Sequence, residues 1–217
     1  IDKRTIGWNR RKEALSKKTE TLIQMIERSW KSGIDASFVL FDSWFAHDDV
    51  ISKIYNIGYG VICRLKRGNV KYTYQGQPYT LKQLWQKVAR RQTVFLSEYQ
   101  VKALCLNVTL PKTGDVRILF ISDGKKQWHA LLSTDLETDA SKMLGYYTRR
   151  WAIEVFFKDA KQMLRLGKEQ SKTFDAVVAS YSIVMLRYLL LVYIISKRRI
   201  IGPIGPLFRQ LSEEQTF

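Results

Sequence analysis

Cysteine and histidine are scarce in this sequence. Its 217 residues include two cysteines, Cys63 and Cys105, and two histidines, His47 and His129. Both cysteines stand alone in apolar, strand-like runs. Two isolated cysteines and two isolated histidines, far apart in sequence, exclude a disulfide scaffold and a zinc site. A reducing, cytosolic setting fits this composition.

Acidic residues are also in the minority. Lys and Arg number 36 against 20 for Asp and Glu, which gives a formal net charge of +16. We interpret this excess as a sign of a polyanionic partner, nucleic acid above all, although a merely soluble basic protein is the alternative. Hydrophobic residues make up 46% of the chain and aromatic residues 12%, so a packed core is expected rather than disorder.

A secretory signal, an internal repeat and a low-complexity tract are all missing. The chain opens on basic and polar residues without an initiator Met, which indicates a processed chain or a piece of a longer protein. Residues 176–196 are long and apolar enough for a membrane span. Arg187 lies in their middle, where a charge is costly, so we favour a buried core helix and keep the membrane span as the alternative.

The order of elements predicts an α/β fold. Helical spacing of apolar residues covers 11–31. A strand–helix–strand unit follows, which is the building block of a parallel sheet; its parts are a strand at 37–41 ending at Asp42, a helix at 47–58 stopped by Gly58, and a strand at 59–66.

The pattern becomes mainly β after residue 66. We expect a hairpin at 70–80 around a Gln-Gly turn, a short helix at 81–89 and three strands within 93–133. Helical periodicity returns from about 138 to about 164, and an apolar helix runs to about 196. The tail, 199–217, contains Gly and Pro breakers and no clear element.

One helical stretch carries a polar stripe. In "YYTRRWAIEVFFKDAK" (146–161), a continuous helix at about 100° per residue would put five side chains within a sector of about 80°: Tyr147, Arg150, Glu154, Lys158 and Lys161. Arg165 falls on the same face. Ordinary i,i+4 ion pairs on a solvated surface are one reading. The other faces of the helix are apolar, which predicts that it packs on several sides. Their apolar residues are Leu144, Ile153, Val155, Phe156, Phe157 and Met163.

The spacing of four stripe residues is the decisive pattern. Tyr147, Arg150, Glu154 and Lys161 read Y-x2-R-x3-E-x6-K, and Trp151 follows the Arg. This resembles the signature of the bacterial insertion-sequence DDE transposases of the YREK group. Residues 36–66 are similar to the segment of those enzymes that carries the second aspartate. The resemblance covers roughly residues 1–198.

The resemblance implies an architecture. It predicts a ribonuclease-H-like core that is truncated at its N-terminal strands and interrupted by a mainly β insertion. The expected parts are a partial core at 1–66, the insertion at 67–133, the C-terminal core helices at 134–198 and a tail at 199–217.

The resemblance also implies the catalytic residues. Asp42 and Glu154 would be catalytic carboxylates and ligands of a two-metal site, for which Mg²⁺ or Mn²⁺ is suited, in cut-and-paste transposition by strand cleavage and strand transfer. A turn or a helix N-cap is the structural alternative for Asp42. We interpret Asp48 and Asp49 as first-turn acids favoured by the helix dipole.

The cations of the stripe would hold DNA. By resemblance, Tyr147, Arg150 and Lys161 would grip phosphates, and we add Trp151 and Lys158 as weaker candidates. In related enzymes an aromatic of the insertion stacks on a flipped base. The candidates are Trp85, Trp128 and His129, for which a place in the core is the alternative.

The first aspartate of the triad has no match. Only Asp2 and Asp35 precede Asp42, and neither is expected in an earlier strand. We therefore expect this chain to be the C-terminal portion of a transposase, inactive alone. A catalytically dead DNA-binding remnant is the alternative, with no divalent-ion requirement. The implied partner is double-stranded DNA, with a homodimer in the full-length protein, no membrane, and a bacterial cytoplasmic, nucleoid-associated location.

Overall fold

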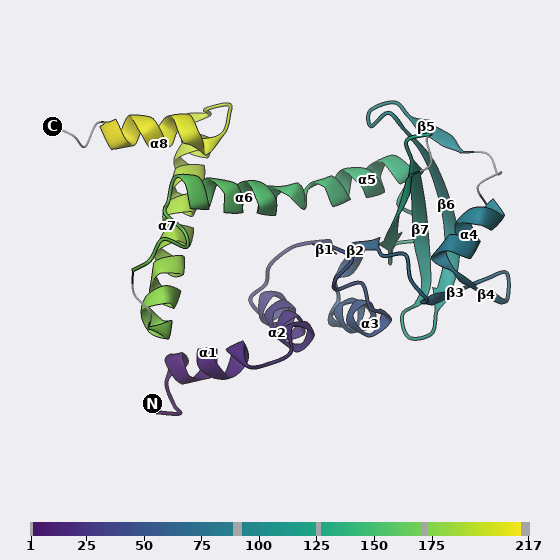
Figure 1. Ribbon diagram of the computed structural model, residues 1–217, viewed down its shortest axis with the longest axis horizontal. Coiled ribbons are helices and arrows are strands. Elements are labelled where there is room, and N and C mark those ends of the chain that lie inside the picture. The colour runs from purple at the N-terminus through teal and green to yellow at the C-terminus, as the bar shows by residue number, and fades with distance from the viewer. Residues whose placement is uncertain (1, 89–92, 125–126, 171–172, 214–217) are drawn as a thin grey trace. The chain divides into compact units, whose positions relative to one another are not determined.

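The computed structural model describes residues 2–88, 93–124, 127–170 and 173–213. The chain divides into two compact units, Ile1–Arg150 and Trp151–Phe217. Figure 1 labels most of their elements along the chain. The division falls inside the segment that we expected to hold the C-terminal core helices, and the four domain boundaries drawn from the sequence remain predictions.

The first unit is built on one mixed sheet of eight strands (Figure 1). Its order is β1-β2-β8-β7-β6-β3-β4, with β5 paired to β6. The β1–β2 pair is parallel and the other pairs are antiparallel. The strands are β1 (Phe38–Phe41), β2 (Gly60–Leu65), β3 (Lys71–Tyr74), β4 (Gln77–Thr80), β5 (Val94–Leu96), β6 (Val101–Leu110), β7 (Gly114–Ser122) and β8 (Trp128–Ser133).

The predicted strand–helix–strand unit is confirmed as β1-α3-β2. Helix α3 spans Asp48–Ile57, and Gly58 ends it with a φ of 120°, a conformation that glycine adopts without a side-chain clash. The two strands then pair in parallel, and their last register partners are Phe41 and Cys63. This register fixes where the chain leaves β1 at Asp42.

The β-rich segment is confirmed, but it continues the same sheet because β8 pairs with β2. The predicted hairpin is β3–β4, whose turn residues Gln75 and Gly76 have φ of 51° and 74°. Four strands, not three, follow helix α4 (Leu81–Val88), since the turn before β6, with Gln100 at φ 54°, separates a short β5. The described residues do not include Ala89 of the expected helix, nor Lys125 and Lys126 of the expected turn.

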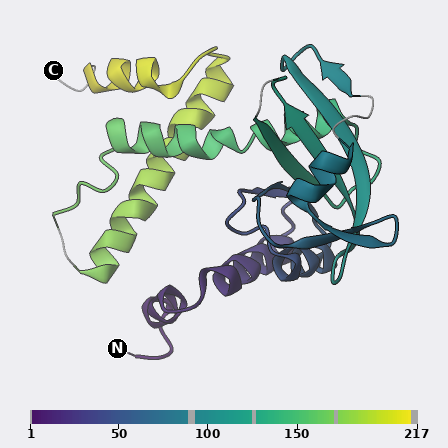
Figure 2. The same ribbon diagram turned by 45° about the vertical axis from the view of Figure 1, so that its right-hand side comes forward.

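The two faces of the sheet pack against different helices. Alternate strand residues such as Phe41, Cys63 and Trp128 join one core cluster with residues of α2, α3 and α4. Figure 2 shows α4 lying across the sheet. The intervening strand residues, such as Ile62, form a second cluster with Met143 of α5 (Ala140–Thr148). The sheet is therefore covered on both sides.

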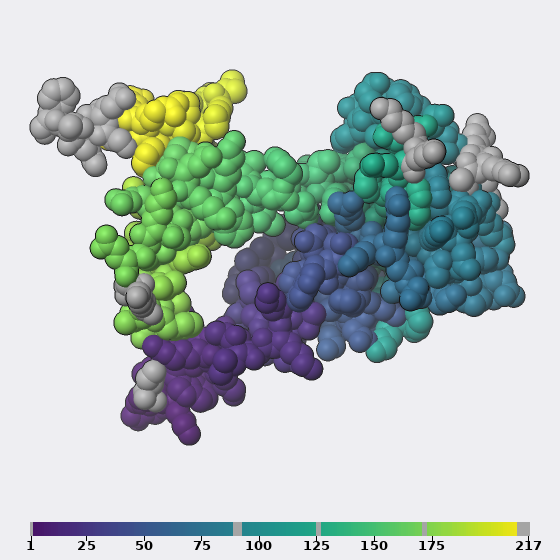
Figure 3. All heavy atoms as spheres, viewed as in Figure 1, coloured from purple at the N-terminus to yellow at the C-terminus, as the bar shows by residue number. Residues whose placement is uncertain are grey.

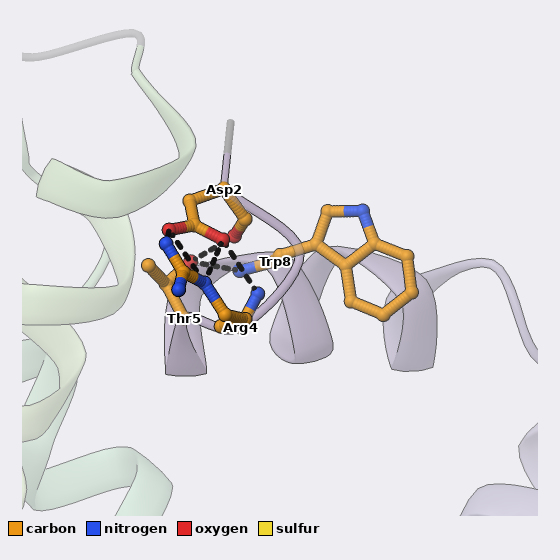
Figure 4. Close-up of polar contacts among 4 residues, drawn as sticks. All are labelled: Asp2, Arg4, Thr5 and Trp8. Carbon is orange, nitrogen blue, oxygen red and sulfur yellow. Dashed lines mark hydrogen bonds and ion pairs between the residues drawn. The ribbon is translucent and has the colours of Figure 1, made fainter.

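The single helix expected at 11–31 is wrong. The chain forms α1 (Ile6–Ala14) and α2 (Lys18–Lys31), and Leu15 between them is 90% exposed. The amides of Leu15 and Ser16 bond three residues back, which tightens and closes the first helix. Figure 4 shows the start of α1, where Thr5 accepts a hydrogen bond from the amide of Trp8.

The second unit consists of three helices, α6 (Trp151–Gln162), α7 (Phe174–Arg198) and α8 (Ile204–Glu213). They share a cluster of buried residues that includes Ala160, Val184 and Leu207, and α8 (yellow) lies against the green helices in Figure 3. The expectation of no clear element in the tail is wrong. Pro206 lies in the first turn of α8, where a proline is tolerated because its missing N–H would have no helical partner.

Helix α7 is not the buried core helix that we expected. It is long and apolar enough to cross a membrane by length and composition, and only 11% of its most apolar stretch is buried. Val184 and Leu191 are its buried residues, whereas Leu186, Leu189 and Leu190 are about three-fifths exposed. The helix is apolar around its circumference, so one packed face leaves the others uncovered.

Replacing Gly58 with alanine tests the α3–β2 connection. An alanine at position 58 would have to keep the backbone φ of 120°. Its Cβ would also lie 2.6 Å from the nearest atom of the Trp30 ring. We expect Gly58→Ala to lower the free energy of unfolding by about 1–2 kcal/mol. The matched control is Gly68→Ala, since the nearest atom there is 4.0 Å away. Urea denaturation compares the two, and equal stability would contradict the described turn.

Candidate functional site

Asp42 is exposed at the carboxyl end of β1. Its Oδ1 accepts a hydrogen bond of 2.8 Å from the amide of Trp44, which closes a local turn. The N-cap of α3 is His47, so the turn interpretation of Asp42 is confirmed and the N-cap interpretation is wrong. The turn directly follows the last residue of β1, so the Asp42 carboxylate lies at the end of that strand.

Asp48 and Asp49 lie in the first turn of α3, as expected. Asp48 also accepts hydrogen bonds from the amides of Lys112 and Thr113, so it ties the helix to the β6–β7 turn. Asp49 pairs with the Lys112 ammonium, and that hydrogen bond lowers the pKa of Asp49. Both acids therefore have a structural role.

The two earlier acids do not supply a strand-borne carboxylate. Asp2 lies in a turn, where Arg4 holds it at 2.8 Å between Nη2 and Oδ2 (Figure 4). Asp35 is exposed in the connection before β1. Neither belongs to a strand, which agrees with the expectation from the sequence.

The polar stripe is divided by a turn. Helix α5 ends at Thr148 and α6 begins at Trp151, so one continuous helix over 138–164 is wrong. The amides of Arg149 and Arg150 bond three residues back, to Tyr146 and Tyr147, which tightens the chain and ends α5. Tyr147 and Arg150 belong to the first unit, and the remaining stripe residues belong to the second.

Tyr147 and Arg150 form one pair at the end of α5. The Arg150 guanidinium carbon lies 5.7 Å from the centre of the Tyr147 ring. Tyr147 packs against the core cluster of Ile62 and Met143. Burial raises the pKa of the Tyr147 hydroxyl, while the charges of Arg150 and Arg64 lower it.

Glu154, Lys158 and Lys161 keep a common face within α6, because offsets of four and seven residues return to one side of a helix. Glu154 is half-buried, and both lysines and Trp151 are exposed. The expectation of packing on several sides is wrong, since three apolar neighbours are exposed: Ile153, Val155 and Phe157. Arg165 has left the helix and takes a left-handed φ of 63°.

The described carboxylates do not by themselves enclose a metal. Carboxylate oxygens suit Mg²⁺ or Mn²⁺. However, the described residues contain no group of three or more His, Cys, Asp or Glu side chains that could hold an ion. Asp42 belongs to the first unit and Glu154 to the second. Among the described residues, neither unit by itself therefore carries the donor set of a two-metal centre.

A family comparison supplies the identification. A model described as a transposase DDE domain matches residues 10–190. The chain belongs to the transposase DDE-domain family. This family consists of enzymes of the endonuclease and transferase type, and its match spans both Asp42 and the stripe. None of the curated proteins matches the chain.

Two aromatic candidates for base stacking in this transposase domain belong to the core. Trp128 is 7% exposed, with the Arg67 guanidinium carbon 4.2 Å from its ring centre. Trp85 stacks against it, with ring centres 5.5 Å apart and planes inclined by 24°. His129 is exposed. The core alternative therefore holds for both tryptophans.

Sequence reasoning missed two features of the site. Arg64 is exposed in the otherwise buried run of β2, and its Nη2 lies 2.9 Å from Nδ1 of His129. Trp44 is 55% exposed two residues after Asp42. The signal for Arg64 was present, because a charge that interrupts a run of buried strand residues marks a side chain at the sheet edge or on a site.

We expect Trp128→Ala to destabilise the fold. Removing a buried indole between Trp85 and Arg67 costs about 3–5 kcal/mol of unfolding free energy. His129→Ala is the control, because its side chain is exposed, and it is expected to change stability little. Thermal and urea unfolding measure both, and a stable Trp128→Ala variant would return Trp128 to the DNA-contacting candidates.

His129 is expected to titrate below its usual pKa of about 6.5. Partial desolvation of its largely exposed ring lowers the pKa of His129, and the charges of Arg64 and Arg67 lower it further, against a raising effect of Asp123. The pKa of His129 is lower in the folded protein than in the unfolded chain, so folding favours the neutral ring. The contribution of His129 to the free energy of unfolding is therefore complete above about pH 6.5 and is lost as the pH falls. An NMR titration should show Arg64→Gln raising this pKa, and an unchanged value would contradict the Arg64–His129 contact.

Proposed function

We propose that the chain is the C-terminal portion of an insertion-sequence transposase of the YREK group that moves DNA by cut-and-paste transposition. The observation that carries the proposal is the Y-x2-R-x3-E-x6-K spacing from Tyr147 to Lys161, which lies inside the matched residues 10–190. The parallel β1–β2 pair ending at Asp42 supports a ribonuclease-H-like core.

Asp42 and Glu154 are the catalytic carboxylates of this proposal. They would hold Mg²⁺ or Mn²⁺ together with a further carboxylate, the first aspartate of the triad, for which neither Asp2 nor Asp35 lies on a strand. Such ions generate nucleophiles and stabilise leaving oxygens in phosphoryl transfer. The contribution of the chain is to present Asp42 at a strand end and Glu154 on a helix with two lysines on the same face.

The cations have a separate task. Arg150, with its planar fork, and Lys161 would bind phosphates of double-stranded DNA, with Tyr147 bracing Arg150. Exposed Trp151 and Lys158 would add contacts. The net charge of +16 supports a polyanionic partner. A homodimer, a bacterial cytoplasmic location at the nucleoid and the absence of a membrane complete the proposal.

Purified protein and labelled duplex DNA test the proposal. We expect salt-sensitive binding, with log K falling linearly with log salt concentration. With Mn²⁺ we expect no strand cleavage by this chain alone, because two carboxylates hold the ions poorly. Glu154→Gln is the control for contaminating nucleases. Nicking that is lost in Glu154→Gln would contradict the predicted inactivity, and the absence of duplex binding would contradict the function.

The second candidate is a catalytically dead, DNA-binding remnant. The net charge of +16 supports it equally well, because binding alone needs only the charge. The two candidates differ in how divalent ions change the affinity of the chain for DNA. A remnant binds DNA equally well with Mg²⁺ or with a chelator and is insensitive to Asp42→Asn. A fragment of a working enzyme gains affinity with Mg²⁺ and loses that gain in Asp42→Asn.

A further inference from the structure

Positive charge is concentrated in the first segment of the chain. Residues 2–18, which we call the basic arm, comprise helix α1 and its two flanks. Asp2 pairs with Arg4 (Figure 4) and Glu13 pairs with Arg28 of α2, each at 2.8 Å between nitrogen and oxygen. The basic arm has these two acids and seven cations, which are Lys3, Arg4, Arg10, Arg11, Lys12, Lys17 and Lys18. The two pairs use both acids but only one of the seven cations, so the basic arm keeps a large positive charge.

Helix α1 has no face that could pack on a core. None of its nine residues, all of which the structure describes, is buried, and none belongs to a core cluster. At about 100° per residue, its apolar residues Ile6 and Trp8 point to nearly opposite sides, and Arg10, Arg11 and Lys12 spread over about half of the circumference. A nine-residue helix without an apolar face is marginal in water. Its stability therefore depends on what it binds.

Two contacts couple the helical conformation of α1 to the position of its cations. Arg11 donates a hydrogen bond of 3.3 Å to the carbonyl of Gly7, and the Lys12 ammonium lies 5.5 Å from the centre of the Trp8 ring. Both contacts join residues that are four apart in sequence, which are neighbours only when the backbone is helical. The cations of α1 are therefore held in place along its surface while the helix is formed.

The charge distribution of α1 selects the class of partner. A helix that lies on a membrane has one wide apolar face, and α1 has none. A DNA duplex carries one negative charge per about 1.7 Å of its axis, and α1 is about 14 Å long, so several phosphates lie within the length of the helix. Phosphates beside Arg10, Arg11 and Lys12 would also neutralise the repulsion among these cations. Duplex DNA therefore fits the charge and the shape of the basic arm.

We propose that the basic arm is a DNA-binding element whose helix α1 becomes stably folded when it lies along the phosphates of a DNA duplex. The proposal rests on the proposed function, since it takes duplex DNA as the ligand. The basic arm contains no residue of the sheet or of the Y-x2-R-x3-E-x6-K motif. It is therefore an additional contact, which can be removed without touching Asp42, Glu154 or the cations of the motif.

Three variants of the full 217-residue chain test the proposal. Arg10→Gln/Lys12→Gln removes two charges from α1 and keeps good helix formers. Asn9→Pro keeps every charge but breaks the helix, because it removes the amide that bonds the Thr5 carbonyl at 3.3 Å. The control, Lys71→Gln/Lys82→Gln, removes two charges from exposed residues of β3 and α4. Since no residue of α1 belongs to a core cluster, we expect the arm variants to fold, and thermal unfolding checks this.

Fluorescence anisotropy over a salt series measures binding to one duplex. We expect Arg10→Gln/Lys12→Gln to lose about tenfold in affinity at low salt and its salt slope to fall by about 1–2, since each lost phosphate contact removes about 0.9. Asn9→Pro should also lose affinity, although its charge is unchanged, because its cations are no longer held along a helix. The control should keep an affinity and a slope close to those of the wild type.

Hydrogen exchange measures the folding of α1 directly. We expect saturating duplex to slow the exchange of the α1 amides in the wild type by about tenfold or more, since an unsupported helix opens often. The same duplex should leave these amides unchanged in Asn9→Pro. Unchanged exchange in the wild type with duplex bound would overturn the proposal, and so would an Asn9→Pro variant that binds as tightly as the wild type.

The remaining outcomes separate this proposal from the proposed function. Equal losses in Arg10→Gln/Lys12→Gln and in the control, with wild-type binding intact, would overturn the basic arm as a DNA-binding element and leave the proposed function standing. A wild-type chain that binds no duplex overturns the proposed function itself. Binding of the basic arm to single-stranded RNA or to anionic lipid vesicles, but not to the duplex, also overturns the proposal.

Discussion

The pairing of β2 with β1 on one side and β8 on the other is the constraint on which the first unit depends. The parallel pair places Asp42 at a strand end level with Arg64. The antiparallel pair brings His129 of β8 within 2.9 Å of Arg64. Burial of Val61, Ile62 and Cys63 fixes this register, because a slip of one residue would exchange the two faces of the strand. Carboxylate and cations therefore share one edge of one sheet.

The turn at Arg149 and Arg150 gives the second organising feature. It divides the motif so that Tyr147 and Arg150 belong to the sheet-bearing unit and Glu154 to the helical unit. A motif carried on one straight helix would hold all its side chains in a fixed relation. Here the Tyr147–Arg150 pair is positioned by α5 and its packing on the sheet, whereas Glu154 depends on α6 and its contacts with α7 and α8.

Local signals made much of the fold predictable. Gly58 ends α3, and Gln75 and Gly76 form the hairpin turn. Both could be predicted because the backbone conformation at such positions depends on the residue itself. The breaks at Leu15 and Arg150 could not be predicted, since each side continues the same helical periodicity and the tightening bonds leave no mark in composition. The exposure of α7 was also hidden, because an apolar helix has the same sequence whether it is covered or not.

The candidate site was predictable to the extent that spacing carries it. The Tyr, Arg, Glu and Lys positions came from one pattern, and the family match spans them. Trp85 and Trp128 could not be assigned from sequence, because a stacked core pair and a base-stacking surface pair have the same composition. Arg64 and His129 are 65 residues apart in sequence, and only the β2–β8 pairing brings them together.

We propose that Asp42 and Glu154 serve one centre on bound DNA. This is tested by chemical cross-linking of the double variant Asp42→Cys/Glu154→Cys with a short bis-maleimide in the presence of duplex DNA. Asp42→Cys/Lys197→Cys is the control pair. Both variants also carry Cys105→Ser, because native Cys105 is only partly buried, whereas native Cys63 is buried. We expect an intramolecular cross-link in the first variant at a yield well above that of the control. A yield equal to that of the control would contradict it.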